Sequence, residues 1–432
     1  MTNRAGANLK IDGNRLWRSL MELSQIGRTP RGGVCRLALT DEDKAARDLF
    51  VEWCREAGCT IRIDAMGNIF ARRAGLEDRL PTILTGSHLD TVPSGGKFDG
   101  ALGVLAGLEV IRTLDAAGYR TQAAVELVVW TNEEGSRFSP VMVSSGVFAG
   151  HIPIEDAKAR RDKSGVTLGE ELSRIGYSGP DSVGGWPVSA YFELHIEQGP
   201  ILEAEHKTIG VVTAVQGLRW YEACITGQEA HAGTTPMDAR RDALTGAAEL
   251  ILAVERIGQQ AAPLGRATTG YIDASPNGRN VVTGSTFLCL DFRHPDDAML
   301  LKMEHDLVAA IEIIRHTRGL ACELKHVTHS PAVTFDPKCV EFVRSAADAL
   351  GYPHRDIVSG AAHDAVYLAR VAPTSMIFVP CRDGLSHNEA EWASEADCAA
   401  GCAVLLQTIL TCDEQLAGIT RAARRDAQGG AS

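Results

Sequence analysis

The chain has 432 residues, enough for roughly two or three domains, and its 45% hydrophobic and 23% charged residues are typical of a soluble globular protein. Its formal net charge of −12, with no basic stripe to offset it, argues against nucleic acid as a partner. No run approaches the roughly 20 uninterrupted apolar residues of a membrane span, and the opening MTNRAGANLKIDGNRLW contains no apolar core of the signal-peptide kind.

The first half of the chain predicts alternating helices and strands. Residues 41–57 have acids in the first turn and Gly58 after the last, which predicts an amphipathic helix. Residues 60–71 are typical of a hairpin that turns at Met66-Gly67-Asn68. Further apolar runs predict a helix over 100–114 and buried strands over 81–87, 125–132, 191–197 and 374–380. This alternation predicts an α/β fold, a mostly parallel sheet flanked by helices on both faces.

The segment 216–333 has a different character. Its pattern is strand–helix–strand–strand–helix–strand, with helices over roughly 239–257 and 297–318. That order predicts a ferredoxin-like α+β domain, an antiparallel sheet with two helices on one face. Because strands of the first kind resume afterwards, we expect one domain from residues 1–215 and 334–432, with 216–333 inserted as a second domain.

Histidines and acids recur at the ends of the expected parallel strands. They are His88, Glu133, Glu134, His195 and His387. Asp99 stands just before the helix expected over 100–114. A lone histidine at a strand end is usually structural, and two adjacent glutamates usually form a solvated surface. Four strand ends that each deliver such a residue instead favour a metal site, because ligands bind beyond the carboxyl ends of parallel strands.

The types of ligand narrow the choice of metal. Imidazoles and carboxylates without thiolates suit zinc, manganese, cobalt or nickel. Five protein ligands are too many for one catalytic zinc, so we expect two divalent ions that share one bridging carboxylate. Such a pair polarises a carbonyl oxygen and lowers the pKa of a shared water. A spare carboxylate must then carry a proton to the leaving nitrogen, and the pair Glu133-Glu134 offers one ligand and one base.

Eight motifs carry a resemblance to a known family. They are GSHLDTVPSGGKFDG, TNEEGSRF, ELHIEQGPILE, GQEAHAGTTPM, GRNVV, LDFRH, SGAAHDA and DGLSHNEAEW, spread over residues 86–392. Together they resemble the co-catalytic zinc exopeptidase clan, in its hydantoinase/carbamoylase amidase branch. That branch contains N-carbamoyl-L-amino-acid hydrolases, β-ureidopropionases and allantoate amidohydrolases. HIEQGPILE and EAHAGTTPM are specific to the branch.

The resemblance implies a role for each residue at the strand ends. Five would be metal ligands: His88 and His195 on one ion, Glu134 and His387 on the other, and Asp99 bridging both. Glu133 would be the general base and acid, and the carboxylate of Asp90 would orient the imidazole of His88 from behind. The resemblance also implies a cis peptide bond between Asp99 and Gly100, a strained form that survives only where a functional site over-determines it.

The inserted domain, by the same resemblance, would be a lid and a dimer interface. From it, His231 would polarise the scissile carbonyl oxygen. Asn280 and Arg293 would hold the substrate's carboxylate, which a guanidinium binds through a bidentate fork. Outside the lid, Gln198 and the backbone of Gly360 would complete the pocket.

Each lid residue also has a structural alternative. His231 could cap a helix in its own chain, Asn280 could belong to a turn, and Arg293 could form an ordinary salt bridge. We assign no catalytic role to His363 and Asp364, because in this family their loop mainly shapes the pocket.

The implied activity is metal-dependent hydrolysis of the ureido C–N bond of an N-carbamoyl amino acid, giving the amino acid, carbon dioxide and ammonia. Zn²⁺ is the first expectation for the ions. Allantoate amidohydrolase is an alternative, since allantoate also joins a ureido group to a carboxylate; an exopeptidase or aminoacylase is a more distant one. A non-catalytic binding or scaffold relative is disfavoured, because such proteins usually lose ligands or the base.

The expected partners are a small ureido substrate and a second copy of the chain, without nucleic acid or membrane. The homodimer would form through residues 216–333 and would lend His231 to the partner's metal site. Eleven cysteines without any Cys-x-x-Cys spacing indicate a reduced, cytoplasmic protein.

Overall fold

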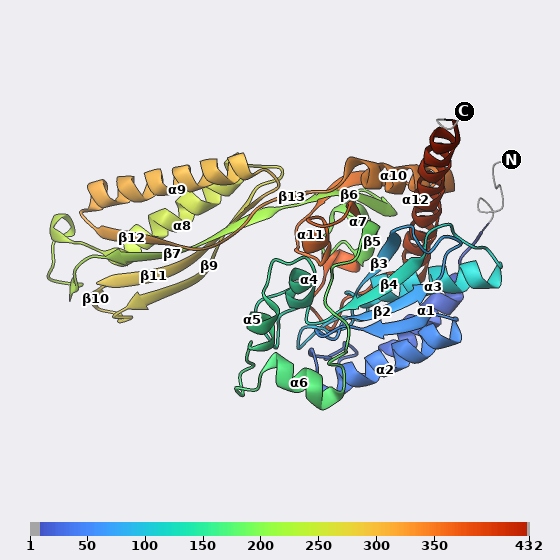
Figure 1. Cartoon of the computed structure of the whole chain (residues 1–432). Coiled ribbons are helices and arrows are strands. Elements are labelled where there is room, and N and C mark those ends of the chain that lie inside the picture. Colours follow the sequence, from blue (N-terminus) through green and yellow to red (C-terminus); the bar gives the residue numbers. More distant parts are fainter. Residues whose placement is uncertain (1–8, 430–432) are drawn as a thin grey trace. The chain divides into compact units, whose positions relative to one another are not determined.

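The computed structural model describes residues 9–429. The first eight residues of the opening segment, where the sequence predicts no signal peptide, lie outside the described residues. The chain forms two compact units (Figure 1). Unit 1 runs to Thr213 and resumes at Phe335, and unit 2 is Ala214–Thr334. The second unit is therefore an insertion in the first.

A nine-stranded sheet runs through unit 1. Its strand order is β1-β2-β4-β3-β5-β15-β6-β13, with β14 paired to β6. The strands are β1 (Thr60–Ile63), β2 (Ile69–Arg73), β3 (Thr82–His88), β4 (Val125–Trp130), β5 (Val188–Ile196), β6 (Ile209–Val215), β13 (Val333–Thr334), β14 (His354–Ser359) and β15 (Thr374–Val379).

The middle of this sheet is parallel. β4, β3, β5 and β15 pair in parallel, whereas β1, β2, β6 and β13 make antiparallel pairs outside them. The α/β fold class is confirmed, with parallel pairing among these four central strands. β3, β4 and β15 are buried along their whole length, which accounts for their continuous apolar sequences. The carboxyl ends of the parallel strands share one edge of the sheet.

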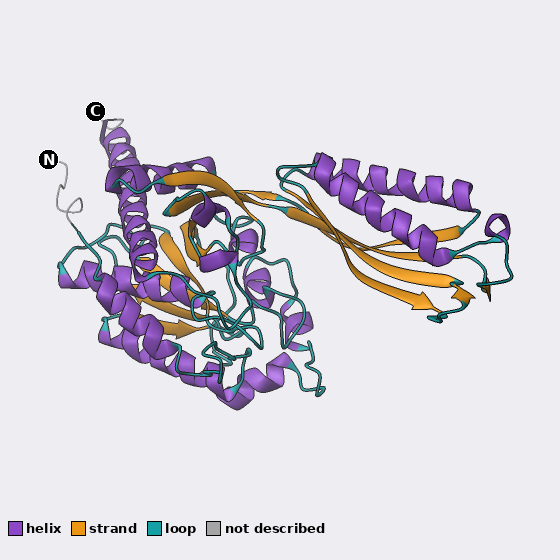
Figure 2. Ribbon diagram, turned by 180° about the vertical axis from the view of Figure 1, so that it is seen from behind, coloured by secondary structure: helices purple, strands orange, loops and turns teal. Residues whose placement is uncertain are grey.

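Helices cover both faces of the sheet (Figure 2). On one face α1, α3, α10 and α12 pack together, where Gly103 and Gly401 allow a close approach to Leu194 of β5. The preceding residue, Glu193, points to the opposite face and accepts the N–H of Ala365 in α11. The helices of unit 1 are α1 (Gly13–Leu23), α2 (Asp41–Glu56), α3 (Ala101–Ala116), α4 (Val143–Phe148), α5 (Ile154–Lys158), α6 (Leu168–Ile175), α7 (Ile201–Ala204), η3 (Arg382–Gly384), α10 (Pro337–Leu350), α11 (Ala365–Leu368) and α12 (Glu395–Gly429).

The last helix contains a long apolar stretch. By length and composition alone, the segment Glu395–Gly418 of α12 could cross a membrane. Most of its apolar stretch, 61%, is buried inside the protein, and α12 packs on α1, α3, α10, β5 and β15. A buried core helix passes the same compositional test.

Unit 2 is a four-stranded antiparallel sheet, in the order β12-β7-β11-β9, with α8 and α9 on one face (Figures 1 and 2). Its main elements have the strand–helix–strand–strand–helix–strand order expected from the sequence. The short strands β8 and β10 pair with each other outside the main sheet. The elements are β7 (Gly217–Thr226), β8 (Ala230–His231), η2 (Met237–Ala239), α8 (Ala243–Gln260), β9 (Arg266–Ser275), β10 (Val281–Val282), β11 (Ser285–His294), α9 (Asp297–Arg318) and β12 (Ala321–Ser330).

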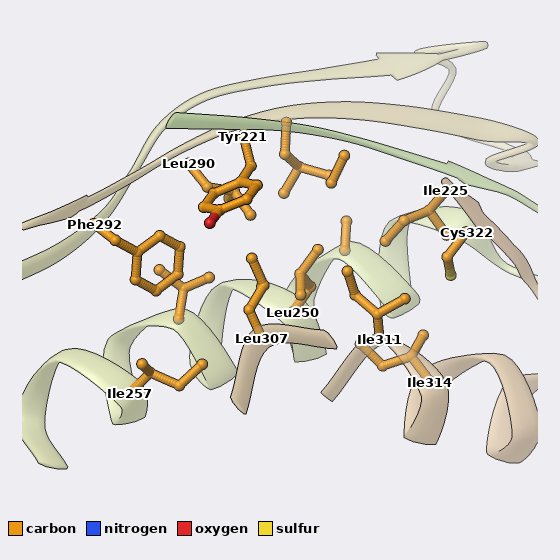
Figure 3. Packing of buried hydrophobic residues seen from close by; sticks show 14 of the residues in the cluster. Tyr221, Ile225, Leu250, Ile257, Leu290, Phe292, Leu307, Ile311, Ile314 and Cys322 are labelled. Carbon is orange, nitrogen blue, oxygen red and sulfur yellow. The ribbon is translucent and has the colours of Figure 1, made fainter. Parts of the chain in front are cut away.

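Unit 2 has a hydrophobic core of its own, between the sheet and the two helices (Figure 3). Alternate residues of β7 and β11 point inward, among them Tyr221, Leu290 and Phe292, and they meet Leu250 of α8 and Leu307 of α9. Removing a side chain of this size from water contributes about 1.5–3 kcal/mol. Packing of α8 and α9 on one face of the sheet therefore stabilises unit 2 as a separate unit.

Candidate metal centre and active site

The parallel strands deliver five potential metal ligands to one edge of the sheet. His88 ends β3 and His195 lies near the end of β5, while Glu134 follows β4, His387 follows β15 and Asp99 precedes α3. The five form two groups, His88–Asp99–His195 and Asp99–Glu134–His387, and in each the donor atoms lie within 4.8 Å of one another. The sheet thus brings together all the ligands expected from the sequence, and the two groups share Asp99.

Asp99 presents one oxygen to each group. Its Oδ1 lies 3.1 Å from Nε2 of His195 and 3.6 Å from Nε2 of His88. Its Oδ2 lies 3.5 Å from Nε2 of His387, which in turn is 3.3 Å from Oε2 of Glu134. This is the arrangement that a carboxylate bridging two cations requires.

The imidazoles of the first group are held in one tautomer. Nδ1 of His88 lies 2.9 Å from the carbonyl oxygen of Asp90, and Nδ1 of His195 lies 2.9 Å from that of Ile196. A carbonyl only accepts hydrogen bonds, so each Nδ1 carries the hydrogen and donates it. In the neutral rings Nε2 is therefore the nitrogen whose lone pair can bind a metal. Nε2 of His195 also lies 3.3 Å from the backbone nitrogen of Gly100.

The second group is more open to solvent. The side chain of His387 is 53% exposed, whereas that of Glu134 is 5% exposed. His387 also has a φ of 53°, a left-handed conformation that is uncommon for residues other than glycine and is frequent at functional sites. One group is thus built into strands, and the other depends on a loop.

Asp90 acts on the centre differently from the way expected. Its backbone carbonyl orients His88, and its carboxylate Oδ1 lies 4.0 Å from Nδ1 of that histidine. The carboxylate instead accepts the backbone N–H groups of Glu133 and Glu134, each at 3.2 Å. The shorter contact to His88 is thus made by the Asp90 carbonyl, while the carboxylate holds the turn that carries the two glutamates. Every residue has a carbonyl, so no sequence pattern distinguishes one that orients a histidine.

The expected cis bond between Asp99 and Gly100 is wrong, since all cis peptide bonds among the described residues precede prolines. Gly100 instead has a φ of 65°, and a Cβ at this position would lie 2.5 Å from the ring of His88. A glycine is needed because it adopts this φ without strain and leaves the imidazole its space. The turn into α3 then points Asp99 at both ligand groups.

The centre concentrates buried negative charge. Burial raises the pKa of Glu133 and Glu134 well above its ordinary value, and repulsion from nearby carboxylates raises it further. Burial alone would also raise the pKa of Asp99, but hydrogen bonds from His195 and His88 outweigh it and hold that pKa well below its usual range. Carboxylates that repel one another in a buried site are stabilised by cations. The donor set therefore fits divalent metal ions of the zinc and manganese type.

Glu133 lies at the centre but belongs to neither ligand group. Its Oε2 is 3.6 Å from Nε2 of His88, and its side chain is buried. A carboxylate beside the ligands, with its pKa raised, is suited to taking up and returning a proton.

Gln198 contacts the carboxylate of Asp99. Its Nε2 donates to Oδ2 of Asp99 at 2.7 Å and to Oγ of Ser386 at 3.2 Å. Sequence reasoning missed Ser386 and also Glu391, which accepts the backbone N–H of Asp99 at 3.1 Å. Their only sequence signal is position, since they flank His387 in the motif DGLSHNEAEW.

Gly360 directly follows β14, in a loop that reaches the first ligand group. Its neighbour Ser359 lies 3.1 Å from Nε2 of His363, whose ring centroid is 4.4 Å from that of His195. Glu193, His195 and His363 bring donor atoms within 4.8 Å of one another. Sequence reasoning overlooked Glu193, although it lies two residues before His195 and therefore on the same face of β5.

The three residues of unit 2 that are expected to contact the substrate lie at two places. His231 of β8 is paired with Val281 of β10, and the carbonyl of Asn280 accepts the N–H of Ala232 at 2.9 Å, so His231 and Asn280 are neighbours. Arg293 lies eight residues along β11 from Ser285, the strand end next to β10, a span of about 27 Å at 3.4 Å per residue.

Two of these side chains, His231 and Arg293, make hydrogen bonds to nearby residues of unit 2. Nδ1 of His231 accepts the backbone N–H groups of Gly233 at 3.0 Å and Thr234 at 3.2 Å, which makes it part of a turn rather than a helix cap. Arg293 donates through Nε and Nη2 to the carboxylate of Asp291 at 2.9–3.1 Å. Both hydrogen bonds to His231 involve its Nδ1 and not its Nε2.

Comparison with known proteins gives consistent matches. Residues 84–411, which contain both ligand groups and Glu133, match the peptidase family M20/M25/M40. The chain is 49% identical over 406 residues to an N-carbamoyl-L-amino-acid amidohydrolase of Rhizobium meliloti, covering 94% of this chain and 97% of that one. It is similar to the crystal structure of a hydantoinase/carbamoylase family amidase from Burkholderia multivorans, with a TM-score of 0.92 and 58% identity over 94% of this chain and 98% of the other. A ureidoglycolate hydrolase of Arabidopsis thaliana is 34% identical over 417 residues, covering 93% and 87%.

Proposed function

The chain belongs to the peptidase family M20/M25/M40, in its hydantoinase/carbamoylase branch, and from this premise we propose that it hydrolyses the ureido C–N bond of N-carbamoyl-L-amino acids. Its similarity to proteins named N-carbamoyl-L-amino-acid amidohydrolase makes it a hydrolase of non-peptide C–N bonds. The observation that carries the proposal is the pair of ligand groups sharing Asp99, with the unliganded Glu133 beside them. The products are the amino acid, carbon dioxide and ammonia.

Two divalent cations, Zn²⁺ first and Mn²⁺, Co²⁺ or Ni²⁺ as alternatives, fit the donor set. His88 and His195 would hold one, Glu134 and His387 the other, and Asp99 both. When bound, the ions polarise the ureido carbonyl and lower the pKa of a water.

Glu133 takes the proton of the attacking water and gives it to the leaving nitrogen. Its position supports this role, because Asp90 holds its backbone N–H at 3.2 Å while its own carboxylate stays outside the ligand groups. Burial, which raises its pKa, makes the carboxyl group a better proton carrier near neutral pH.

His231 stabilises the developing negative charge on the carbonyl oxygen. Because its Nδ1 accepts two backbone N–H groups, the neutral ring carries its hydrogen on Nε2 and can donate it to an oxygen. Asn280, the neighbour of His231, and Arg293 bind the substrate's carboxylate, and Gln198 and the backbone of Gly360 complete the pocket.

One small substrate cannot reach both ends of unit 2. Arg293 lies about 27 Å along β11 from the strand end beside His231 and Asn280, which is far longer than an N-carbamoyl amino acid. If all three residues act on one substrate, they come from two copies of the chain. We therefore include a homodimer through unit 2 in the proposal, in which one chain supplies Arg293 and its partner supplies the other two.

One alternative substrate follows from a specific observation. Similarity to a ureidoglycolate hydrolase makes ureidoglycolate or allantoate the alternative substrate, since each joins a ureido group to a carboxylate. A non-catalytic relative is the less favoured alternative, because all five ligands and Glu133 are in place.

A reducing compartment such as the cytoplasm is the proposed location, since all eleven cysteines are unpaired. Neither nucleic acid nor membrane is part of the proposal.

A substrate panel tests the proposal. Purified protein reconstituted with Zn²⁺ or Mn²⁺ is assayed for ammonia release from N-carbamoyl-L-amino acids, their D-enantiomers, β-ureidopropionate, ureidoglycolate and allantoate. We expect the highest kcat/KM for an N-carbamoyl-L-amino acid. A preference for ureidoglycolate or allantoate would replace the proposed substrate with the alternative, and no hydrolysis of any of them would contradict the proposal.

A further inference from the structure

Glu391 is a buried carboxylate that contacts the segment carrying the bridging ligand. Its Oε1 accepts the backbone N–H groups of Phe98 at 3.0 Å and Asp99 at 3.1 Å. Its Oε2 lies 2.8 Å from the hydroxyl of Ser386, and the side chain is 2% exposed. One carboxylate thus links the segment before α3 to the loop that carries His387.

Ser386 extends this link to the bridging oxygen. Its Oγ lies 2.8 Å from Oδ2 of Asp99 and 2.8 Å from Oε2 of Glu391, so its single hydrogen can be donated to either carboxylate. Oδ2 is the oxygen that faces His387, at 3.5 Å. The hydroxyl is therefore placed to set the direction of the oxygen that serves the second ligand group.

The surrounding packing fixes the carboxylate in this place. A Cβ on Gly96 would lie 2.0 Å from Oε1 of Glu391, so only glycine fits beneath it. The next residue, Trp392, packs its ring edge-on against Phe98 at 5.6 Å and against Trp17 at 5.5 Å. The loop and the segment before α3 are thus held together by apolar contacts around the polar link.

The two ligand groups differ in how much they need such support. His88 and His195 lie in strands, and a backbone carbonyl fixes each ring through Nδ1. His387 lies in a loop at a φ of 53°, and in the described part of the chain no hydrogen bond to its Nδ1 is found. Its place relative to Asp99 therefore depends on the loop.

We propose that Ser386 and Glu391 are positioning residues that hold Asp99 Oδ2 and the His387 loop in register, and so set the affinity for the ion bound by Asp99, Glu134 and His387. The inference rests on the proposed two-ion site and goes beyond it. The ion held by His88 and His195 depends much less on Ser386 and Glu391, because backbone carbonyls fix its two imidazoles independently.

Zn²⁺ titration of metal-free protein against a chromophoric chelator tests the inference. Groups that orient metal ligands typically contribute about 10–100-fold in affinity, so in Glu391→Ala and Ser386→Ala we expect one of the two bound ions to weaken by about ten-fold or more. Glu391→Gln should bind as wild type does, because its amide oxygen accepts both N–H groups and its Nε2 donates to Ser386. Glu389→Ala is the matched control, since this loop glutamate faces Arg31 at 3.6 Å instead of Asp99.

A double variant identifies the ion affected. Glu134→Gln removes a ligand of the second group, and adding Glu391→Ala to it should leave the affinity of the remaining ion unchanged. If Ser386→Ala lowers the affinity for both ions equally, or if Ser386→Ala and Glu391→Ala both bind with wild-type affinity, the proposed positioning role of Ser386 and Glu391 is overturned. Fewer than two ions in the wild-type protein would overturn the proposed metal site itself. Ser386→Ala keeps the test valid if Glu391→Ala fails to fold.

Discussion

Glu133 and Glu134 occupy adjacent positions in one turn but have different neighbours. Asp90 holds both backbone N–H groups at 3.2 Å, so the turn is rigid and successive side chains diverge. Oε2 of Glu134 lies 3.3 Å from His387, whereas Oε2 of Glu133 lies 3.6 Å from His88 and joins no ligand group. These positions support the proposed roles of Glu134 as a metal ligand and Glu133 as the proton carrier.

The two isosteric substitutions should therefore separate metal content from turnover. Glu133→Gln is expected to keep both ions and to lower kcat by about 10²–10⁴-fold, the usual contribution of general acid–base catalysis. Glu134→Gln is expected to lose one metal equivalent. Elemental analysis together with ammonia release measures both quantities. Normal turnover in fully loaded Glu133→Gln would rule out this division of roles.

Arg293→Lys tests the proposed carboxylate contact. A lysine keeps the charge but loses the bidentate fork, and charge-assisted hydrogen bonds contribute about 1.5–3 kcal/mol. We expect kcat/KM to fall about ten-fold or more, mainly through a higher KM. Arg266→Lys, at the position paired with Arg293 across β9, is the matched control. Equal effects of the two substitutions would argue for an ordinary salt bridge in unit 2.

At the scale of elements, the junction between β3 and α3 places His88 and Asp99. Gly100 turns the chain at a φ of 65° with the His88 ring 2.5 Å from where a Cβ would be. Gly118, after α3, has a φ of 59° but open space around it. The two glycines share a backbone conformation and differ in what surrounds them.

Gly100→Ala and Gly118→Ala should consequently differ in metal binding. A left-handed φ costs an alanine about 1–2 kcal/mol, so both variants are expected to lower the free energy of unfolding in urea. Only Gly100→Ala should also displace His88 and lose the ion of the first group. If Gly100→Ala keeps two ions, the added Cβ does not displace His88, and this account of Gly100 is wrong.

The strand pattern predicted this edge of the sheet well. Parallel strands must end together, so the placement of His88, His195 and the residues after β4 follows from period and burial. Contacts made by the backbone do not follow in this way. The carbonyl of Asp90 and the φ of Gly100 depend on how the chain turns, and Glu391 reaches Asp99 across 292 residues of sequence. Such contacts leave no local signal.

At the scale of the whole molecule, the separation of His231 from Arg293 within unit 2 predicts sharing between chains. His231→Ala and Glu133→Ala are each expected to be inactive alone. In a mixed dimer, the chain with His231→Ala keeps its own Glu133 and receives His231 from its partner. Random pairing should then restore roughly a quarter of wild-type sites, measured as ammonia release after the two variants are refolded together.

The control for this mixing is a direct measure of mixed dimers, for example by pull-down of differently tagged chains. If His231 served its own chain, every site in every pairing would lack one residue. Mixed dimers that form but stay inactive would end the proposal that His231 acts on the partner's substrate.

The central claim is that ureido hydrolysis takes place at a two-ion centre with Glu133 as the proton carrier. Ammonia release from an N-carbamoyl-L-amino acid, followed while Zn²⁺ or Mn²⁺ is returned to chelator-treated protein in measured equivalents, tests it most directly. We predict no activity without metal and a plateau at two ions per chain, while Glu133→Gln binds the same two ions and stays nearly inactive. Full ammonia release by the metal-free protein, or by fully loaded Glu133→Gln, would contradict the claim.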